Sequence, residues 1–322
     1  MVASSRSNRT SGGVGSETEP RSRRPASAEG RGEGQGLVEV KGLHHYTLSV
    51  GSLDETVGWY TRVLGFKPTC QNSTHPWGRV AYMQGPGLIL EILEVKGSRP
   101  LPSYAAGPEP DTDLDVCGHK HFALLHPDVA AAVGELKALG ENVLSFKRVD
   151  LEEVGEFLAA FIADNTGGLI ELPEGGDAAC GSELVGSLGI TKLHHIAVCV
   201  PDREEAVRWY STVLGFSLAT SFEVPSIGLR SAMMQAPGFW LEIHSKAGSA
   251  PVPAERRDPH EDVQTRGNKY FSLGIRDAAA AVVLLEKAGI DIVAKESAPG
   301  PDRFFIRDTS GNPIELVQVV KS

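Results

Sequence analysis

Residues 43–50 read LHHYTLSV, and residues 193–200 read LHHIAVCV. Both runs are largely apolar, and each begins with two adjacent histidines. Side chains alternate between the two faces of a strand, so one histidine of each pair shares a face with small or polar residues. This histidine is His45 in the first run and His195 in the second. We therefore predict that both runs are strands and that His45 and His195 point into a cavity.

Each histidine pair belongs to a longer internal repeat. KGLHHYTLSVGSLDETVGWYTRVLGF (41–66) matches TKLHHIAVCVPDREEAVRWYSTVLGF (191–216), and AFIADNTGGLIELPE (160–174) matches FFIRDTSGNPIELVQ (304–318). Matches that recur in the same order along the chain indicate a duplicated unit. The two copies are expected to fold into two similar domains.

The repeat places these domains at residues 40–174 and 190–320. Residues 1–36 are rich in Ser, Arg, Gly, Glu and Pro and have few apolar side chains. Such a segment buries too little surface to offset the entropy cost of ordering it, so we predict a disordered tail.

Within each copy the same order of elements occurs twice: a strand, a helix and three more strands. Ser52 and Glu55 form a capping-box pattern at the start of the first helix, and Gly65 is suited to its end. The predicted fold is therefore α+β, with four βαβββ modules. Strands that do not alternate one for one with helices argue against a doubly wound parallel sheet.

Composition excludes several classes of function. The formal net charge of −10 over 322 residues argues against a nucleic-acid partner, which would need clustered Lys and Arg. No apolar run approaches the length of about 20 residues that spans a bilayer. The four cysteines form no CxxC pair, and the N-terminus has no apolar signal segment. We expect a cytoplasmic protein that binds a small molecule, as a monomer or homodimer.

Glutamates recur in the middle of strands that are otherwise apolar. Glu91 in LILEILEV and Glu242 in FWLEIHS hold equivalent places, as do Glu171 in LIELPE and Glu315 in PIELVQ. A carboxylate within a buried strand costs free energy unless it is paired or bound to a metal. Four such positions, together with histidines on companion strands, favour metal ligands over isolated salt bridges.

The two copies differ at the start of a third strand. The first copy reads GHKHFALL and the second reads GNKYFSLG. By register with His45, the cavity residue is His121 in the first copy and Tyr270 in the second. Tyrosine is a poor ligand for a divalent metal at neutral pH because its reference pKa is about 10. One site is therefore expected to be intact and the other degenerate.

These motifs resemble the vicinal oxygen chelate superfamily, which includes glyoxalase I, bleomycin-resistance proteins and extradiol dioxygenases. The resemblance covers residues 41–320 and rests on the histidine-headed strand, the helix ending WYTRVLGF or WYSTVLGF, the LEI strand and the final glutamate strand. It implies that the modules form two glyoxalase-like half-open barrels. It also implies one metal ligand from the first strand and one from the last strand of each module.

Two pairings of the modules are possible, and each implies its own ligand sets. Consecutive pairing, which we favour because the links within each copy are long enough to cross a barrel, gives an intact set and a degenerate one: His45, Glu91, His121 and Glu171, and His195, Glu242, Tyr270 and Glu315. The exchanged pairing also gives an intact set and a degenerate one: His121, Glu171, His195 and Glu242, and His45, Glu91, Tyr270 and Glu315. Two histidines and two carboxylates suit Ni, Zn, Fe, Co or Mn.

Three functions remain open at this stage. A glyoxalase-like lyase or isomerase would act through an enediolate on a small oxygenated substrate, with Glu171 or Glu91 moving the proton. A non-haem Fe(II) dioxygenase of the extradiol type would need two histidines and one carboxylate. A binding or resistance protein would sequester a small molecule. The fourth ligand favours the lyase or isomerase.

Overall fold

The computed structural model describes residues 36–75, 77–101, 110–153, 155–175, 188–296 and 302–319. These described residues belong to one compact unit. The predicted tail, residues 1–36, lies outside the described residues apart from Gly36. Within the described part, no helix is both long and apolar enough to cross a membrane.

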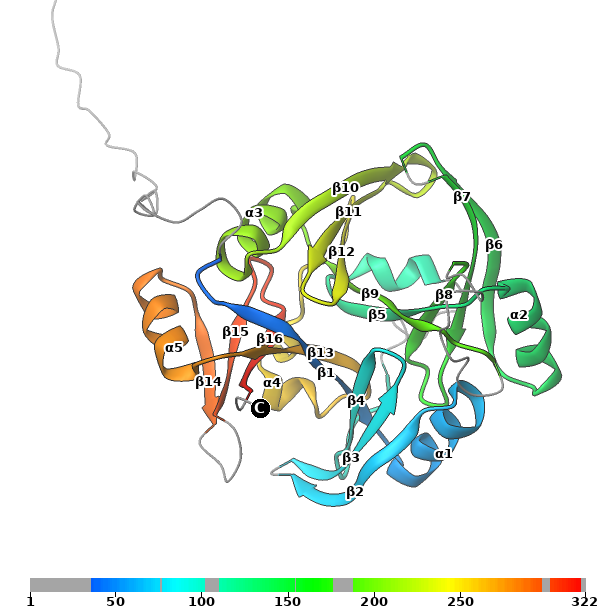
Figure 1. The fold of residues 1–322 in the computed structure, drawn as a ribbon, viewed down its shortest axis with the longest axis horizontal. Helices are drawn as coiled ribbons and strands as arrows, with labels where there is room; N and C mark the ends of the chain where they lie inside the picture. The colour runs from blue at the N-terminus through cyan, green and yellow to red at the C-terminus, as the bar shows by residue number, and fades with distance from the viewer. Residues whose placement is uncertain are drawn as a thin grey trace, which may run out of the picture. The chain divides into compact units, whose positions relative to one another are not determined.

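Four βαβββ modules follow one another along the chain, as the repeat predicted (Figure 1). Module 1 consists of β1 (Val40–Val50), α1 (Leu53–Leu64), β2 (Lys67–His75), β3 (Gly78–Gly85) and β4 (Leu88–Glu94). Module 2 consists of β5 (Gly118–Leu125), α2 (Val129–Ala138), β6 (Val143–Leu151), β7 (Gly155–Ala163) and β8 (Leu169–Pro173). Module 3 consists of β9 (Lys192–Cys199), α3 (Arg203–Leu214), β10 (Ser217–Val224), β11 (Leu229–Ala236) and β12 (Phe239–Lys246). Module 4 consists of β13 (Gly267–Ile275), α5 (Ala278–Lys287), β14 (Ile292–Glu296), β15 (Arg303–Arg307) and β16 (Pro313–Gln318).

Short helices lie in the links and at one strand turn: η1 (Pro110–Asp115), η2 (Pro225–Ile227), η3 (Ala254–Arg256) and α4 (Pro259–Asp262). The first helices of the two copies begin and end as their sequences predict. The Ser52 hydroxyl accepts a hydrogen bond from the backbone N–H of Glu55 at 3.4 Å, and Gly65 ends α1 with φ 71°. Asp202 and Gly215 cap α3 in the same way, with φ 73° at the glycine. These are left-handed conformations that glycine adopts without steric cost.

The described strands form two eight-stranded mixed sheets, and each sheet joins one module from each sequence copy. The 1–4 sheet has the order β14-β15-β16-β13-β1-β4-β3-β2. The 2–3 sheet has the order β10-β11-β12-β9-β5-β8-β7-β6 and curls into a half-open barrel (Figure 1). Antiparallel pairs β1–β13 and β5–β9 join the modules. The consecutive pairing that we favoured is therefore wrong, and the modules are exchanged.

The exchange follows from the path of the two links that cross between the sheets. The link from β4 to β5 runs beside the link from β12 to β13. The backbone N–H of Arg99 donates to Gln264 O at 2.7 Å, and that of Ala250 donates to Asp115 O at 2.8 Å. Both links are thus long enough to cross, as the sequence indicated. They cross from one sheet to the other instead of across one barrel.

Two buried lysines attach these links to the strands that follow them. Lys120 Nζ donates to the backbone oxygen of Asp113 at 2.7 Å, and Lys269 Nζ donates to that of Asp262 at 3.1 Å. Each ammonium also lies within 3.4 Å of a side-chain oxygen of the same aspartate. A buried lysine without such partners would be costly, so each pair ties its link to the first strand of the next module.

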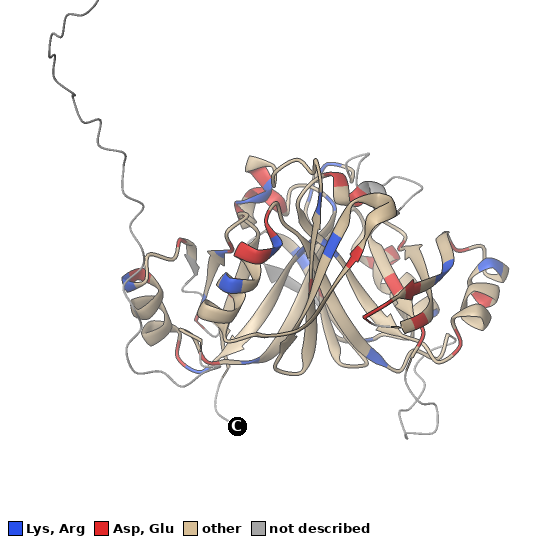
Figure 2. Ribbon diagram, turned by 90° about the horizontal axis from the view of Figure 1, so that it is seen from above, with Lys and Arg blue, Asp and Glu red and all other residues tan. Residues whose placement is uncertain are grey.

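The sheets pack together through their apolar faces, and the histidine faces are turned away from this core. Tyr46 of β1 meets Phe122 of β5 with ring centroids 5.4 Å apart, and Phe239 of β12 lies 6.3 Å from Phe271 of β13. Charged residues occur on the helices and loops and also along the strands (Figure 2). The candidate sites are the mid-strand carboxylates that are buried, namely Glu91, Glu171, Glu242 and Glu315.

Candidate metal centre

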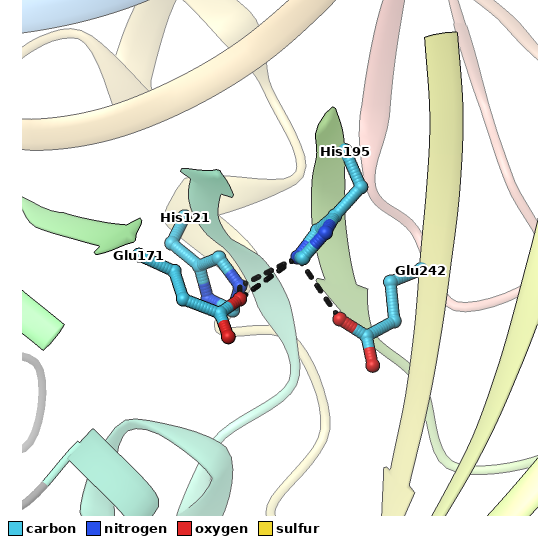
Figure 3. A group of neighbouring side chains, drawn as sticks. All are labelled: His121, Glu171, His195 and Glu242. Atoms are coloured by element: carbon cyan, nitrogen blue, oxygen red, sulfur yellow. Dashed lines mark hydrogen bonds and ion pairs between the residues drawn. The ribbon is translucent and has the colours of Figure 1, made fainter. Parts of the chain in front are cut away.

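Four side chains converge on the cavity face of the 2–3 sheet (Figure 3). They are His121 of β5, Glu171 of β8, His195 of β9 and Glu242 of β12. We call them the quartet. Among the described residues, they are the group whose His Nε2 or Nδ1 and carboxylate donor atoms all lie within 4.8 Å of one another.

The spacing within the quartet matches what one cation requires. His195 Nε2 lies 3.1 Å from Glu171 Oε2 and 3.0 Å from Glu242 Oε2. His121 Nε2 lies 3.2 Å from Glu171 Oε2 and 3.2 Å from His195 Nε2. Ligands about 2.1 Å from a common ion, at right angles, are about 3.0 Å apart. Two imidazoles and two carboxylates also form a donor set that suits divalent transition metals, so the residues fit an ion.

Electrostatics in the quartet couples its members strongly. Burial alone would lower the pKa of His195, but the carboxylates of Glu242 and Glu171 outweigh burial and raise that pKa to about 10. Burial would raise the pKa of Glu171, yet hydrogen bonds from His121 and His195 bring it below its usual value. The pKa of Glu242 is lowered in the same sense, because the neighbouring imidazoles of His244 and His195 outweigh burial. Without a metal, protonated His195 therefore forms ion pairs with both Glu171 and Glu242.

The outer histidine of each pair explains why two histidines occur in a row. His194 Nδ1 lies 2.8 Å from His195 Nδ1, and His44 Nδ1 lies 2.7 Å from His45 Nδ1. Burial and the neighbouring His195 lower the pKa of His194 to about 4, so its ring is neutral at pH 7. Nδ1–H of His195 therefore donates to His194, which leaves Nε2 directed at the cavity. Such support of a ligand's second nitrogen is usual in metal sites.

The 1–4 sheet carries the related cluster, built on His45. His45 Nε2 lies 3.4 Å from Glu91 Oε2 and 3.2 Å from Glu315 Oε2. Burial lowers the pKa of His45, but Glu91 and Glu315 together raise it to about 10. Arg303 Nη1 lies 3.6 Å from Glu315 Oε1, which adds a second positive charge. Two cationic side chains therefore lie beside two carboxylates in this cluster.

Side-chain hydroxyl groups donate hydrogen bonds to the carboxylates of the 1–4 sheet. Thr47 Oγ1 donates to Glu91 at 3.0 Å, and Tyr82 Oη donates to the same carboxylate at 2.5 Å. Ser272 donates to Glu315 and lies 2.9 Å from His45 Nε2. The carboxylates are thus engaged by side chains of their own sheet.

The 2–3 sheet has no such hydroxyls at the matching register positions. Ala197 pairs with Glu242 as Thr47 pairs with Glu91, and Met233 pairs with Glu242 as Tyr82 pairs with Glu91. Ala123 pairs with Glu171 as Ser272 pairs with Glu315. Among the described residues, the carboxylates of Glu171 and Glu242 therefore make polar contacts with histidines and with no hydroxyl group.

Tyr270 of β13 holds the place in the 1–4 sheet that His121 of β5 holds in the 2–3 sheet. Its ring is 1 % exposed and packs against Phe305 with centroids 5.0 Å apart, in an apolar cluster that includes Val80 and Leu93. Burial raises the pKa of Tyr270 well above its ordinary value, so the phenol stays neutral. At neutral pH the side chain therefore offers no anionic donor.

The structure separates the two sets that consecutive pairing predicted. His45 and Glu91 lie on the 1–4 sheet, whereas His121 and Glu171 lie on the 2–3 sheet. The predicted degenerate set is also divided, with His195 and Glu242 on the 2–3 sheet and Tyr270 and Glu315 on the 1–4 sheet. The sets of the exchanged pairing are the ones brought together. Glu91 therefore does not face the same cavity as Glu171, and its counterpart beside Glu171 is Glu242.

Two residues near the quartet were not predicted as site residues. His244 follows Glu242 on the same face of β12, and its Nε2 lies 3.6 Å from Glu242 Oε2. Ser231 of β11 pairs with His244, with Oγ 2.7 Å from Nδ1. The sequence carries a signal for His244, because strand alternation places it on the same face of the strand as Glu242. No pattern in the sequence indicated Ser231, because its partner His244 lies on another strand.

A cavity of about 340 Å³ opens beside the quartet, with His121 and His244 in its lining. Phe161, Leu169 and Leu229 contribute apolar surface. Three charged residues of β6, Lys147, Arg148 and Asp150, also line it. This size is typical of a site for a small molecule.

The chain matches a known family twice. The sequence pattern of the Glyoxalase/Bleomycin resistance protein/Dioxygenase superfamily matches residues 42–172 and residues 192–316. Each match spans one copy of the repeat.

Lactoylglutathione lyases match this chain at low sequence identity. A lactoylglutathione lyase of Arabidopsis thaliana is 24 % identical over 234 residues, which is 72 % of this chain and 72 % of that protein. A lactoylglutathione lyase of Salmonella typhimurium is 28 % identical over 141 residues, which is 43 % of this chain and 96 % of that protein. The crystal structure of glyoxalase I from Zea mays superposes with a TM-score of 0.62 at 20 % identity, covering 86 % of this chain and 92 % of that one. At this identity the last comparison supports the fold alone.

Proposed function

Because the chain belongs to the Glyoxalase/Bleomycin resistance protein/Dioxygenase superfamily, we propose that the quartet is the metal centre of a glyoxalase-like lyase or isomerase. One observation carries the proposal. Among the described residues, the carboxylates of Glu171 and Glu242 have polar contacts with histidines alone, whereas those of the 1–4 sheet bind hydroxyl groups. Carboxylates left in this state are available to a cation.

In this proposal His121, His195, Glu171 and Glu242 hold one divalent ion. When bound, the ion would act as a Lewis acid that polarises two neighbouring oxygens of a small substrate. His194 keeps Nδ1 of His195 occupied, so that Nε2 remains the ligand atom. The apolar lining of the cavity, including Phe161 and Leu169, excludes water from the substrate.

A glutamate of the quartet would move the proton. Glu171 and Glu242 lie on opposite sides of His195 and are both ionised, since the pKa of each is lowered. A carboxylate there can take a proton from a carbon next to a carbonyl and return it to the adjacent carbon. Glu91, the other base suggested by the sequence, takes no part because it lies on the other sheet.

The substrate proposed is a small oxygenated molecule. Two of the relatives are lactoylglutathione lyases, so the hemithioacetal of methylglyoxal and glutathione is the first compound to assay. A panel of other 2-oxoaldehyde adducts and 2-hydroxy ketones extends the search beyond glutathione. Isomerisation is followed by absorbance or by loss of a deuteron from the labelled carbon.

The decisive experiment combines metal analysis with paired variants. Wild-type protein purified without added metal, then loaded with Ni, Co, Zn, Mn or Fe, should bind one ion per chain. Glu171→Gln and Glu242→Gln should each weaken metal binding and abolish turnover. Glu91→Gln and Glu315→Gln, the matched controls on the 1–4 sheet, should leave the stoichiometry at one.

Other outcomes would replace the proposal. Two ions per chain would mean that Tyr270 does not disable its site. Full turnover in both quartet variants would remove the mechanism. Oxygen uptake by the Fe(II)-loaded protein with a catechol would indicate a dioxygenase instead, and tight binding of a small molecule with no metal would indicate a sequestering protein.

A further inference from the structure

His244 and Ser231 form a polar pair on the cavity face that metal binding by the quartet does not require. Ser231 is fully buried and His244 is 6 % exposed. Their side chains meet at 2.7 Å, between Ser231 Oγ and His244 Nδ1. Burying two polar groups costs free energy, which the contact between them only partly offsets. The pair therefore needs a reason to be polar.

The matching positions of the 1–4 sheet show that packing alone does not need this pair. Val80 and Leu93 pair across β3 and β4 as Ser231 and His244 pair across β11 and β12. Both Val80 and Leu93 belong to an apolar cluster with Tyr270 and Phe305. The same scaffold thus packs well with aliphatic side chains where the ligand set is incomplete. The polar pair accompanies the complete quartet.

The tautomer of His244 follows from its two neighbours. Its Nε2 faces Glu242 Oε2, and an ionised carboxylate can only accept a hydrogen bond. In the neutral ring the proton therefore sits on Nε2, and the Ser231 hydroxyl donates to Nδ1. The distance of 3.6 Å from Nε2 to Glu242 is too long for a hydrogen bond. The Nε2–H group is thus held in place, and within the described part of the chain it has no hydrogen-bond acceptor.

The unused donor lies where a substrate would bind. His244 and His121 both line the cavity of about 340 Å³, with ring centroids 6.0 Å apart. Phe161, Leu169 and Leu229 supply apolar surface in the same cavity. A molecule that reaches the quartet therefore meets a fixed N–H donor on one side and apolar side chains on another.

We propose that His244, held by Ser231, is the substrate-orienting residue of the 2–3 sheet, and that the substrate carries an apolar group beside its pair of oxygens. His244 Nε2–H donates to one of these oxygens, and the apolar group packs against Phe161, Leu169 and Leu229. This inference rests on the proposed function, because the oxygens are brought to His244 by the ion that the quartet would hold.

The test measures binding of two hydroxamates, which present a pair of oxygens on either a phenyl or a methyl group. Co(II)-loaded protein is titrated with benzohydroxamate and acetohydroxamate, and binding is followed by calorimetry and by the visible absorption of Co(II). In the wild type, benzohydroxamate should bind at least about tenfold more tightly, because its ring is removed from water.

Substitutions then separate orientation from metal binding. His244→Leu, which introduces the residue found at the matching position 93, should weaken benzohydroxamate binding roughly 10- to 100-fold while Co(II) affinity stays within about twofold. His244→Gln keeps an N–H donor and should restore part of the loss. Ser231→Ala should have a smaller effect in the same direction. Leu93→Met on the 1–4 sheet is the matched control and should change neither affinity.

The possible results distinguish the inference from the proposed function. Unchanged benzohydroxamate affinity in both His244→Leu and Ser231→Ala, with Co(II) still bound, overturns the inference alone. Equal affinity of the wild type for the two hydroxamates overturns its apolar part. Failure of the wild type to bind Co(II) overturns the proposed function and this inference together. If His244→Leu does not fold, the comparison of His244→Gln and Ser231→Ala with the wild type decides the outcome.

Discussion

Metal binding at the quartet should release a proton from His195, and this prediction tests the site through its electrostatics. In the metal-free protein Glu242 and Glu171 raise the pKa of His195 to about 10. The imidazolium must lose its proton before Nε2 can bind an ion. Glu171 and Glu242 are already ionised, because the pKa of each is lowered, and so they release none.

The magnitude follows from the size of the shift. At pH 7 a group with a pKa of about 10 is deprotonated in about one molecule in a thousand, so metal affinity is reduced about a thousandfold, or about 4 kcal/mol. The sign is fixed: the proton competes with the metal below the raised pKa, so affinity rises as pH rises. Between pH 7.5 and 9 the affinity should increase about tenfold per pH unit, and the increase should level off near pH 10.

Calorimetry in buffers of different ionisation enthalpy measures the proton directly. A plot of observed binding enthalpy against buffer ionisation enthalpy should have a slope that corresponds to about one proton released per ion. His45→Ala serves as the control, because His45 has an equally raised pKa but lies on the 1–4 sheet. A slope of zero in the wild type, or a slope that disappears in His45→Ala, would refute the assignment of the proton to His195.

Three further predictions concern single side chains and their counterparts in the other copy. His194→Ala should lower metal affinity roughly 10- to 100-fold, because it removes the hydrogen-bond partner of His195 Nδ1. His44→Ala should leave metal affinity unchanged, and equal effects of the two variants in a competition titration would argue against orientation by the outer histidine. Tyr60→Phe and Tyr210→Phe should each lower the free energy of unfolding by roughly 1 to 3 kcal/mol. The reason is that each phenol donates to a buried aspartate in a module of the other sheet, Tyr60 to Asp164 at 2.9 Å and Tyr210 to Asp308 at 3.1 Å. Urea denaturation checks this, and a loss near zero would mean that these bonds do not hold the sheets together. His45→Ala should cost roughly 3 to 5 kcal/mol at pH 7, because it leaves two buried carboxylates short of a cation. In the wild type, the stability contributed by His45 is fully present below about pH 6.5 and is lost as pH rises through about 10. A difference in unfolding free energy between wild type and His45→Ala that is the same at about pH 10.5 as at about pH 7 would contradict the assignment.

The sequence determined the repeating module, the ends of its first helices and the face on which each ligand candidate lies. These features depend on contacts between near neighbours in the chain. Alternation along one strand directs His195 and Glu242 to the cavity face, and Ser52 and Gly65 delimit α1 by hydrogen bonds within one or two turns. They would be the same whichever modules pair.

Tertiary structure alone decided which modules share a sheet, and with them which histidines and carboxylates meet. That choice depends on the two crossing links, whose mutual hydrogen bonds join residues far apart in the sequence, such as Arg99 and Gln264. Both pairings bury the same apolar faces and satisfy the same strand pattern, so the pattern cannot distinguish them. The buried pairs of Lys120 with Asp113 and Lys269 with Asp262 fix the links in space, and only then do the four ligands of one cavity come from both copies of the repeat.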